Sequence, residues 1–358
     1  MHTREILSFL PGLLGGVAIF LFGMNMLSEG LQKTAGEKLR HIISILTNNP
    51  ITGILVGALV TAIIQSSSAT TVMVIGFVSA GLMTLKQSIG VIIGANIGTT
   101  VTAWLVSIDI GDLALPLAGI GFILYFFPKL KKLKYIGQII FSFGLLFVGL
   151  NIMNDMMAPL AKSQAVADTM LRVSNNRFLG LFIGTILTAI IQSSSAAIAI
   201  VQKLAIQTTA AGEPLITIRA ALPILFGSNI GTTATALLAS IGASVNAKRA
   251  ALTHTIFNIV GSLIFIWFIG PFEHVVSLLV GGAIHPDLMD TAIAYSHTLF
   301  NLVNAVLFAP FISLLAKLVT RIYKGKGEYE DRVLVYIGDK VSSPAVGLNL
   351  AMQEMLRM

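Results

Sequence analysis

The chain has 358 residues, of which 55% are hydrophobic and 11% are charged, with a formal net charge of +7 and a mean hydropathy of +0.87. A soluble domain carries about 25% charged residues, so this composition excludes an ordinary soluble domain. The sequence contains no cysteine, which excludes disulfides and thiolate metal sites. The positive charges lie in short loops between apolar runs, as is typical of membrane-flanking loops rather than of a nucleic-acid surface.

Apolar stretches taken in chain order predict about seven membrane-spanning helices, at residues 10–31, 86–107, 112–127, 136–157, 216–241, 249–270 and 290–321. Each can cross ~30 Å of hydrocarbon at about 1.5 Å per residue. Residues 50–81 and 177–208 differ, because each has a polar cluster in its middle. They are too short for two full spans, which need roughly 40 residues. We therefore predict that each forms a re-entrant helical hairpin.

The chain contains an internal duplication. GALVTAIIQSSSA at residues 57–69 returns as GTILTAIIQSSSA at residues 184–196, an offset of 127. GANIGTTVTA at residues 94–103 returns as GSNIGTTATA at residues 227–236, an offset of 133. Upstream, Gly23-Met24-Asn25 matches Gly149-Leu150-Asn151. Three ordered matches predict two structural repeats, at residues 1–127 and at residues 128–325, the second with a closing helix.

Re-entrant hairpins make the two repeats inverted, because three crossings then separate corresponding helices. With the N-terminus outside and the C-terminus inside, fourteen Lys and Arg residues fall on the inside and six on the outside. If each hairpin crossed the membrane once, the split would be about twelve to eight. The positive-inside rule therefore favours an all-α, multi-pass plasma-membrane protein with inverted repeats and a cytoplasmic C-terminus. Such repeats, with broken helices near the midplane, are typical of secondary transporters.

The QSSS motif in each predicted hairpin is the leading candidate site. Four consecutive polar residues cover every face of a helix, so close helix packing by small residues does not explain them all. The N-terminus of the second half-helix offers free N–H groups to an anion, and the carbonyl groups that end the first half-helix suit Na⁺. The anion-binding candidates are Ser66, Ser67, Ser68, Ser193, Ser194 and Ser195, and Gln65 and Gln192 are cation-binding candidates.

The repeated NIGTT segment places a helix-weakening glycine beside Asn and Thr. We expect an unwound stretch that lends oxygen ligands to a cation; a polar crossing between packed helices is the alternative. The candidate Na⁺ ligands are Asn96, Thr99, Thr100, Asn229, Thr232 and Thr233.

A second echo, HTxFN, starts at His254 and again at His297. An intramembrane His is a functional hypothesis by default, but the spacing favours two helices that support each other through His–Asn hydrogen bonds. Glu29 and Asp155 end equivalent helices, and we expect them to be capping or solvated groups.

Paired QSSS motifs, each followed by G-[AS]-N-I-G-T-T, resemble the type II sodium–phosphate cotransporter family and its bacterial relatives, over about residues 9–320. The resemblance implies Na⁺-coupled import of inorganic phosphate at a site framed by the two hairpins. It also implies a cytoplasmic PhoU-like domain, and residues 326–358 look like a tail that begins one, with the chain truncated at Met358. By the same resemblance Gly111-Asp112 makes Asp112 a weak candidate near an extra Na⁺. The first repeat lacks the HxFN-like helix that the family can carry in both.

We therefore expect a phosphate symporter with Na⁺ as the coupling ion and no cofactor, and membrane lipid as its surroundings; a homodimer stays open. The sequence has no GxxxxGK[ST], HExxH or CxxC motif, so no enzymatic activity is expected. A symporter of another oxyanion such as sulfate, coupled to Na⁺ or H⁺, is one alternative. A phosphate-sensing membrane scaffold is the other.

Overall fold

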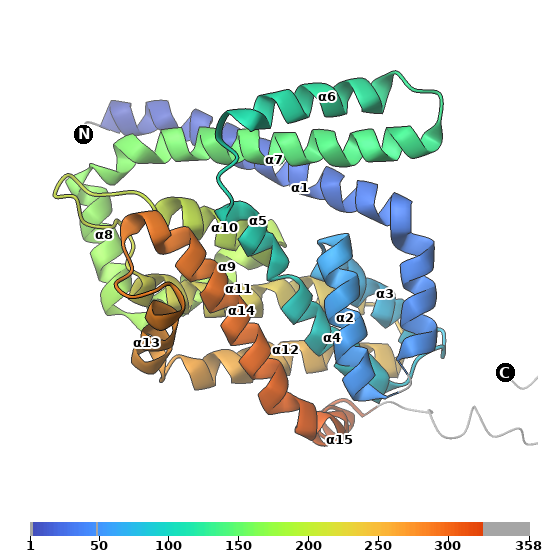
Figure 1. The fold of residues 1–358 in the computed structure, drawn as a ribbon. Helices are drawn as coiled ribbons and strands as arrows, with labels where there is room; N and C mark the ends of the chain where they lie inside the picture. Colours follow the sequence, from blue (N-terminus) through green and yellow to red (C-terminus); the bar gives the residue numbers. More distant parts are fainter. Residues whose placement is uncertain (1–2, 48, 325–358) are drawn as a thin grey trace, which may run out of the picture.

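The computed structural model describes residues 3–47 and 49–324 (Figure 1). The predicted tail at residues 326–358 lies outside this range. The helices are α1 Thr3–Leu46, α2 Pro50–Ile64, α3 Ser67–Ser79, α4 Leu85–Gly98, α5 Val101–Ser107, α6 Ala114–Phe126, α7 Lys131–Ala161, α8 Gln164–Asn175, α9 Arg177–Ile191, α10 Ser194–Ala205, α11 Ile218–Ala239, α12 Val245–Phe265, α13 Ile269–Leu279, α14 Met289–Phe308 and α15 Ile312–Ile322, with short 3₁₀ turns at Gly111–Leu113, Pro286–Leu288 and Ala309–Phe311.

The described residues confirm the predicted all-α membrane architecture. Five helices or helix runs are long and apolar enough to cross a membrane, and two bent pairs, α8 with α9 and α12 with α13, raise the number to seven. The helices α2 and α3 form hairpin 1, and α9 and α10 form hairpin 2. Helix α8 was not predicted, because its polar sequence interrupts the apolar pattern. The predicted helix at residues 249–270 instead bends by 88° after Phe265.

The contact between α1 and α7 shows that the repeats are inverted. A methyl group added at Gly23 would lie 2.7 Å from the backbone nitrogen of Leu146, and one added at Gly149 would lie 2.4 Å from that of Phe20. Phe20 and Gly23 are the repeat equivalents of Leu146 and Gly149, so one contact occurs twice. Phe20 contacts Gly149 and Gly23 contacts Leu146, so residue numbers rise in opposite directions along the two helices. These equivalent helices therefore run antiparallel. A two-fold axis perpendicular to the helices relates them, as inverted repeats require.

Glycines also bring each hairpin against a spanning helix. A methyl group added at Gly94 of α4 would lie 1.9 Å from the carbonyl oxygen of Ile54 in hairpin 1. Its equivalent, Gly227 of α11, would place one 2.0 Å from the carbonyl oxygen of Leu181 in hairpin 2. Such direct contact between backbones is the membrane form of tight helix packing. It fixes the first arm of each hairpin against the NIGTT helix of its own repeat.

The helices α12 and α14 form a third symmetric pair. The rings of Phe257 and Phe308 have centroids 5.1 Å apart, and so do the rings of Phe265 and Phe300. The 43-residue offset of the HTxFN echo carries one pair onto the other. Between the two ring pairs, Gly261 lies directly against the Asn304 amide. The helices therefore cross antiparallel on the same kind of two-fold axis.

This symmetry gives α14 the position in repeat 1 that α12 has in repeat 2. Ser262 of α12 donates a hydrogen bond to the carbonyl of Phe226 in α11 at 2.9 Å. Trp104 of α5 donates its indole N–H to Thr298 of α14, also at 2.9 Å. Helix α6, which follows α5 in the chain, lies against α7 at the edge of the molecule (Figure 1). The last long helix therefore completes the first half of the core.

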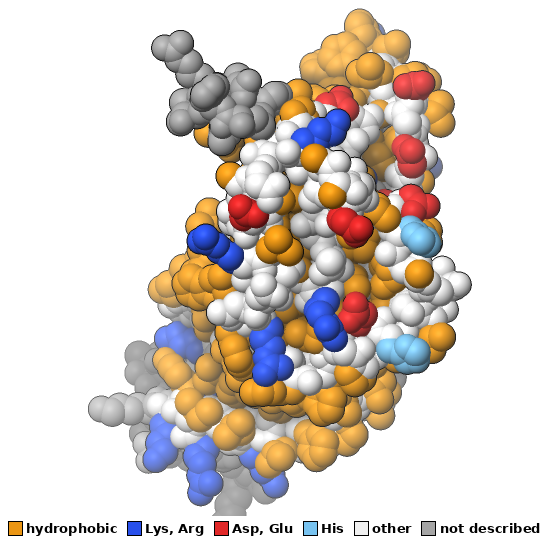
Figure 2. Space-filling model, turned by 90° about the vertical axis from the view of Figure 1, so that its left-hand side faces the viewer, with side chains coloured by type: hydrophobic (Ala, Val, Ile, Leu, Met, Phe, Trp, Pro, Cys, Tyr) orange, Lys and Arg blue, Asp and Glu red, His pale blue; other side chains and the backbone are white. Residues whose placement is uncertain are grey.

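Basic side chains gather near the base of hairpin 1, where Lys86 of α4 lines a cavity with Lys317 and Arg321 of α15, and Lys248 of α12 lies over the Tyr323 ring. There Ser244 donates its backbone N–H to Ser79 at 3.1 Å, and Arg249 donates to the Tyr323 carbonyl at 3.1 Å. The opposite end, which carries α8 and α13, intersperses acidic and basic groups (Figure 2), and Arg219 pairs there with Glu273 at 3.3 Å. The charges therefore distinguish the two ends of the molecule.

We predict that Gly94→Ala lowers the thermal stability of the detergent-purified protein. The added methyl group has no space against the Ile54 carbonyl, and overpacking of this kind costs about 1–3 kcal/mol. Gly119→Ala in α6 is the matched control, because nothing lies within 4 Å of a methyl group there; it should be neutral or slightly stabilising. Equal melting midpoints for the two variants would contradict the contact.

The inverted repeats predict opposite accessibility for two equivalent positions. Lys86 and Arg219 both lie in the first turn of their helices, α4 and α11, and both are exposed. In this cysteine-free chain, a membrane-impermeant maleimide should label Lys86→Cys from one side of the membrane and Arg219→Cys from the other. Labelling of both variants from the same side of sealed vesicles would contradict the inversion.

Candidate functional site

The two QSSS motifs adopt the same turn. Gln65 and Gln192 end the first arms in the left-handed conformation, each with φ 59°, and each donates its backbone N–H to a threonine carbonyl at 2.7 Å. Ser66 and Ser193 then cap the second arms, and their hydroxyls accept from Ala69 N–H at 3.1 Å and Ala196 N–H at 3.2 Å. A left-handed residue other than glycine costs about 1–3 kcal/mol and is retained where the surroundings require it. Both glutamines therefore hold the same strained turn.

The start of each second arm leaves backbone donors free at the turn. The first N–H groups of an α-helix have no partner within the helix. In each second arm the capping serine accepts from the third N–H group of the helix. The N–H groups of Ser67 and Ser68 in α3, and of Ser194 and Ser195 in α10, therefore remain free. Ser67, Ser194 and Ser195 are buried, and Ser68 is partly buried. Each tip thus combines two free N–H groups, serine hydroxyls and the positive end of a helix dipole.

Each hairpin contacts the other repeat. The hydroxyls of Ser68 in hairpin 1 and Thr235 in α11 are 3.3 Å apart. On the other side, Gln202 of hairpin 2 donates to the carbonyl of Ala103 in α5 at 3.0 Å. Within repeat 1, Thr102 of α5 donates to the Gln65 side-chain oxygen at 3.0 Å. Each hairpin therefore packs against the helix that contains or directly follows the NIGTT segment of the other repeat.

The NIGTT segments differ from the prediction. In repeat 1 the helix is interrupted only at Thr99-Thr100, and in repeat 2 α11 continues through the whole segment, so the expected unwound stretch is wrong there. Asn96 and Asn229 are buried and donate to the carbonyls of Ile92 and Leu225, both at 2.9 Å. These bonds use the amide N–H groups and keep the helix intact. The segments can therefore offer side-chain oxygens without unwinding.

Two threonines of repeat 2 have buried hydroxyls with no hydrogen-bond partner in the described chain. They are Thr188, in the first arm of hairpin 2, and Thr232, in α11. Gly231, which precedes Thr232, packs against Thr188, because a methyl group added at Gly231 would lie 2.7 Å from Thr188 Cβ. In repeat 1 the equivalent Thr61 donates to Thr70 at 2.9 Å, but hairpin 2 has Ala197 at the position of Thr70.

Buried hydroxyls without partners cost free energy, and hard cations take such neutral oxygens as ligands. The hydroxyls of Thr188 and Thr232 are therefore oxygens of the kind that a small cation takes as ligands. Both threonines lie in repeated motifs, TAIIQSSSA and NIGTT. Thr232 was among the predicted cation ligands. Thr188, Thr102 and Thr235 were not predicted as site residues, although all three lie in the repeated segments.

The remaining candidates lie away from these contacts. Asp112 is exposed in the 3₁₀ turn after α5, and no described hydrogen bond joins it to a NIGTT segment. Glu29 is exposed, pairs with Lys33 at 2.7 Å and accepts from Gln138 at 3.0 Å, which agrees with an interfacial role. Asp155 is exposed as well.

The expected hydrogen bonds between the two HTxFN helices do not form. Asn258 and Asn301 each donate to the carbonyl of the histidine on their own helix, at 3.0 and 2.9 Å. The rings of His254 and His297 are buried and have no partner among the described residues. The helices do pack together, but through phenylalanine rings.

Comparisons with known proteins agree with this arrangement. The sequence profile of the family described as "Na+/Pi-cotransporter" matches twice, at residues 19–155 and 152–284, once for each repeat. The chain is 35% identical to "Uncharacterized protein YqeW" of Bacillus subtilis over 253 residues, 71% of this chain and 80% of that protein. No solved structure matches it.

Two further relatives carry functional names. The chain is 29% identical to Escherichia coli K12 "Putative inorganic phosphate export protein YjbB" over 269 residues, 75% of this chain and 48% of that protein. It is 36% identical to human "Sodium-dependent phosphate transport protein 2B" over 117 residues, 30% of this chain and 17% of that protein. The chain therefore spans about half of YjbB and a smaller part of the human protein. With two profile matches that together cover most of its length, it belongs to the Na+/Pi-cotransporter family.

Proposed function

We propose that the protein is a secondary transporter that couples Na⁺ to the movement of inorganic phosphate through one central site. The observation that carries the proposal is the contact of each hairpin with the other repeat, at the helix that contains or directly follows its NIGTT segment. The hydrogen-bonding distance between Ser68 and Thr235 and the Gln202–Ala103 bond join the halves. A site at such a repeat interface can face either side of the membrane as the repeats move.

The two hairpin tips supply a suitable environment for phosphate. They carry serine hydroxyls and free N–H groups, and the motifs contain no Lys or Arg. Two helix N-termini contribute roughly half a positive charge each, which is less than the charge of phosphate near pH 7. Na⁺ at the neighbouring threonine oxygens would supply the remainder. Phosphate and Na⁺ should therefore strengthen each other's binding by the same factor.

Uptake in proteoliposomes tests the function. Labelled phosphate should enter when Na⁺ is outside, and replacement of Na⁺ by K⁺ or choline should abolish uptake. Equal uptake in K⁺ would contradict the proposed Na⁺ coupling. A preference for sulfate over phosphate would contradict the proposed substrate. No accumulation or exchange of either anion would favour the scaffold alternative.

We propose import as the physiological direction, with the basic end of the molecule in the cytoplasm, as the positive-inside rule favours. The name of the relative YjbB favours the opposite direction. Phosphate flux measured in vesicles of known protein orientation, under inward and then outward Na⁺ gradients, separates the two. Flux that is faster toward the N-terminal side under matched gradients would support export.

Thr232→Val should raise the Na⁺ concentration needed for half-maximal uptake, with little effect on stability. The replacement keeps the shape of the side chain and removes a hydroxyl that has no protein partner. Thr253→Val is the control, because this buried hydroxyl on α12 bonds the Arg249 carbonyl at 2.8 Å. An unchanged Na⁺ dependence in a folded Thr232→Val protein would end the proposed cation role of this oxygen.

Ser67→Ala and Ser194→Ala should weaken phosphate binding by similar factors, because one site spans both turns. A lost hydrogen bond to a charged group costs about 1.5–3 kcal/mol, or roughly ten- to hundredfold in affinity. Ser240→Ala is the control, because this hydroxyl bonds within its own helix. Calorimetry on purified protein measures all three. Full affinity in either hairpin variant would place the phosphate elsewhere.

A further inference from the structure

A groove of about 580 Å³ lies between the first turn of α4 and the last turns of α15. The two helices belong to long apolar segments, Leu85–Ser107 and Pro286–Ile322, that can cross a membrane. The groove lies where the first segment begins and the second ends, which places it at the membrane surface. Its lining residues are Thr84, Leu85, Lys86, Ala316, Lys317, Thr320 and Arg321.

Three cations and no carboxylate line this groove. Lys86, Lys317 and Arg321 are all exposed, and no ion pair between described residues includes any of them. Cations that gather in a hollow with low-dielectric walls create a local positive potential. The groove therefore complements a negatively charged partner.

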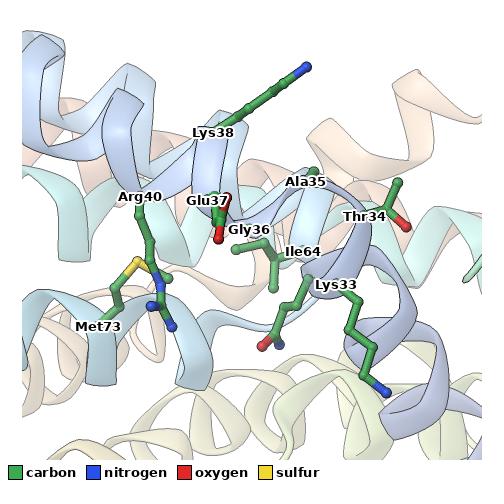
Figure 3. Close-up of a pocket in the computed structure, with 10 residues that line it drawn as sticks. Lys33, Thr34, Ala35, Gly36, Glu37, Lys38, Arg40, Ile64 and Met73 are labelled. Carbon is green, nitrogen blue, oxygen red and sulfur yellow. The ribbon is translucent and has the colours of Figure 1, made fainter. Parts of the chain in front are cut away.

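Other cavities of the molecule carry both signs of charge. The cavity of about 360 Å³ between α1 and hairpin 1 is lined by Arg40 and also by Glu37 (Figure 3). A cavity beside α8 is lined by Lys162 and Glu213. A cationic lining without a carboxylate is therefore not a general property of the cavities in this chain.

Repeat 2 has an equivalent groove that differs by one carboxylate. Helix α13 matches α15 residue for residue at the 43-residue offset of the HTxFN echo, and α11 begins 133 residues after α4. Glu273 stands at the position of Ala316 and pairs with Arg219, the equivalent of Lys86, at 3.3 Å. The second groove therefore contains its own counter-charge. Its lining includes Thr217, Ile218, Glu273, His274 and Ser277, the equivalents of Thr84, Leu85, Ala316, Lys317 and Thr320.

The groove between α4 and α15 also lies beside apolar surface. Leu314, Leu318 and Ile322 of α15 are exposed, and their spacing of four residues places them on one stripe of the helix. Cations next to an apolar stripe match the two parts of a phospholipid, the headgroup phosphate and an acyl chain. Inorganic phosphate would use the cations alone.

We propose that this groove binds an anionic phospholipid, with Lys86, Lys317 and Arg321 around the headgroup phosphate and an acyl chain along the apolar stripe of α15. The inference goes beyond transport, because none of these residues belongs to a QSSS turn or a NIGTT segment. The lipid would bridge α4, which carries the first NIGTT segment, and α15.

Single cysteines at equivalent positions compare the two grooves in the intact, otherwise cysteine-free protein. Thr320→Cys lies in the groove of α4 and α15, and Ser277→Cys lies in that of α11 and α13. Each variant carries a bimane label in phosphatidylcholine nanodiscs that contain a brominated lipid, which quenches the label on contact. Brominated phosphatidylglycerol should bind beside Thr320→Cys about tenfold more tightly than brominated phosphatidylcholine. At Ser277→Cys the two lipids should bind equally.

Neutralising the cations tests their part in this preference. Lys86→Gln, Lys317→Gln and Arg321→Gln should each lower the preference for phosphatidylglycerol about three- to tenfold, the effect of one charge near the membrane surface. Lys129→Gln is the matched control, because it removes the same charge from an exposed residue in the loop between α6 and α7. No preference at Thr320→Cys, or an equal fall with Lys129→Gln, would overturn the proposal.

Glu273→Ala makes the converse test in the second groove. The replacement removes the counter-charge of Arg219, so a preference for phosphatidylglycerol should appear at Ser277→Cys. An unchanged result there would contradict the role given to the missing carboxylate, and with it the proposal.

Two other occupants give different results. Inorganic phosphate, added at constant ionic strength, should leave the quenching unchanged, and full release of the lipid would assign the groove to the free anion. Glu328, Glu330 and Asp331 follow α15 in the sequence. A lipid preference that appears only after these three are neutralised would assign the groove to that acidic segment. Either result would overturn the proposal, and none of these measurements requires phosphate transport.

Discussion

A helix that stops inside a membrane leaves backbone groups without partners, and the rest of this structure follows from that constraint. Each hairpin meets it twice, with a left-handed glutamine that closes the first arm and a serine that caps the second. Glycine contacts such as that of Gly94 with the Ile54 carbonyl then shield the hairpin within protein. The backbone donors that remain free are those at the turn, and these are the donors that the proposed anion site would use.

The two repeats share most of their contacts but differ at a few positions. The two-fold relation, visible in the paired contacts of α1 with α7 and of α12 with α14, gives the core two matching halves. The departures from it distinguish the halves chemically. Ala197 leaves Thr188 without the partner that Thr70 gives Thr61, and α11 continues through the NIGTT segment where α4 ends at Gly98.

The sequence predicted the features that depend on repetition and hydropathy. Both hairpins were predicted within a few residues of their observed bounds, and so was the inversion, because hydropathy and the repeat offsets record them directly. The local state of the NIGTT segments was not predictable. A glycine followed by two threonines weakens a helix in isolation. Yet α11 continues through this segment and α4 ends at Gly98, although the glycines of both helices pack equally closely on their hairpins. The position of α14 depends on tertiary contacts between distant segments, which no local pattern encodes.

The position of α14 also bears on how the protein is made. Helix α5 and hairpin 2 leave the ribosome well before α14, yet both pack against it, through Trp104 and through the bond from Gln202 to the Asp290 carbonyl. The first half of the core therefore remains open during synthesis until nearly the whole membrane region has been inserted. Domains that fold as they emerge avoid this exposure. Here the Trp104 indole and the Gln202 amide lack these partners until the last long helix arrives, so the packing of α14 completes the membrane region.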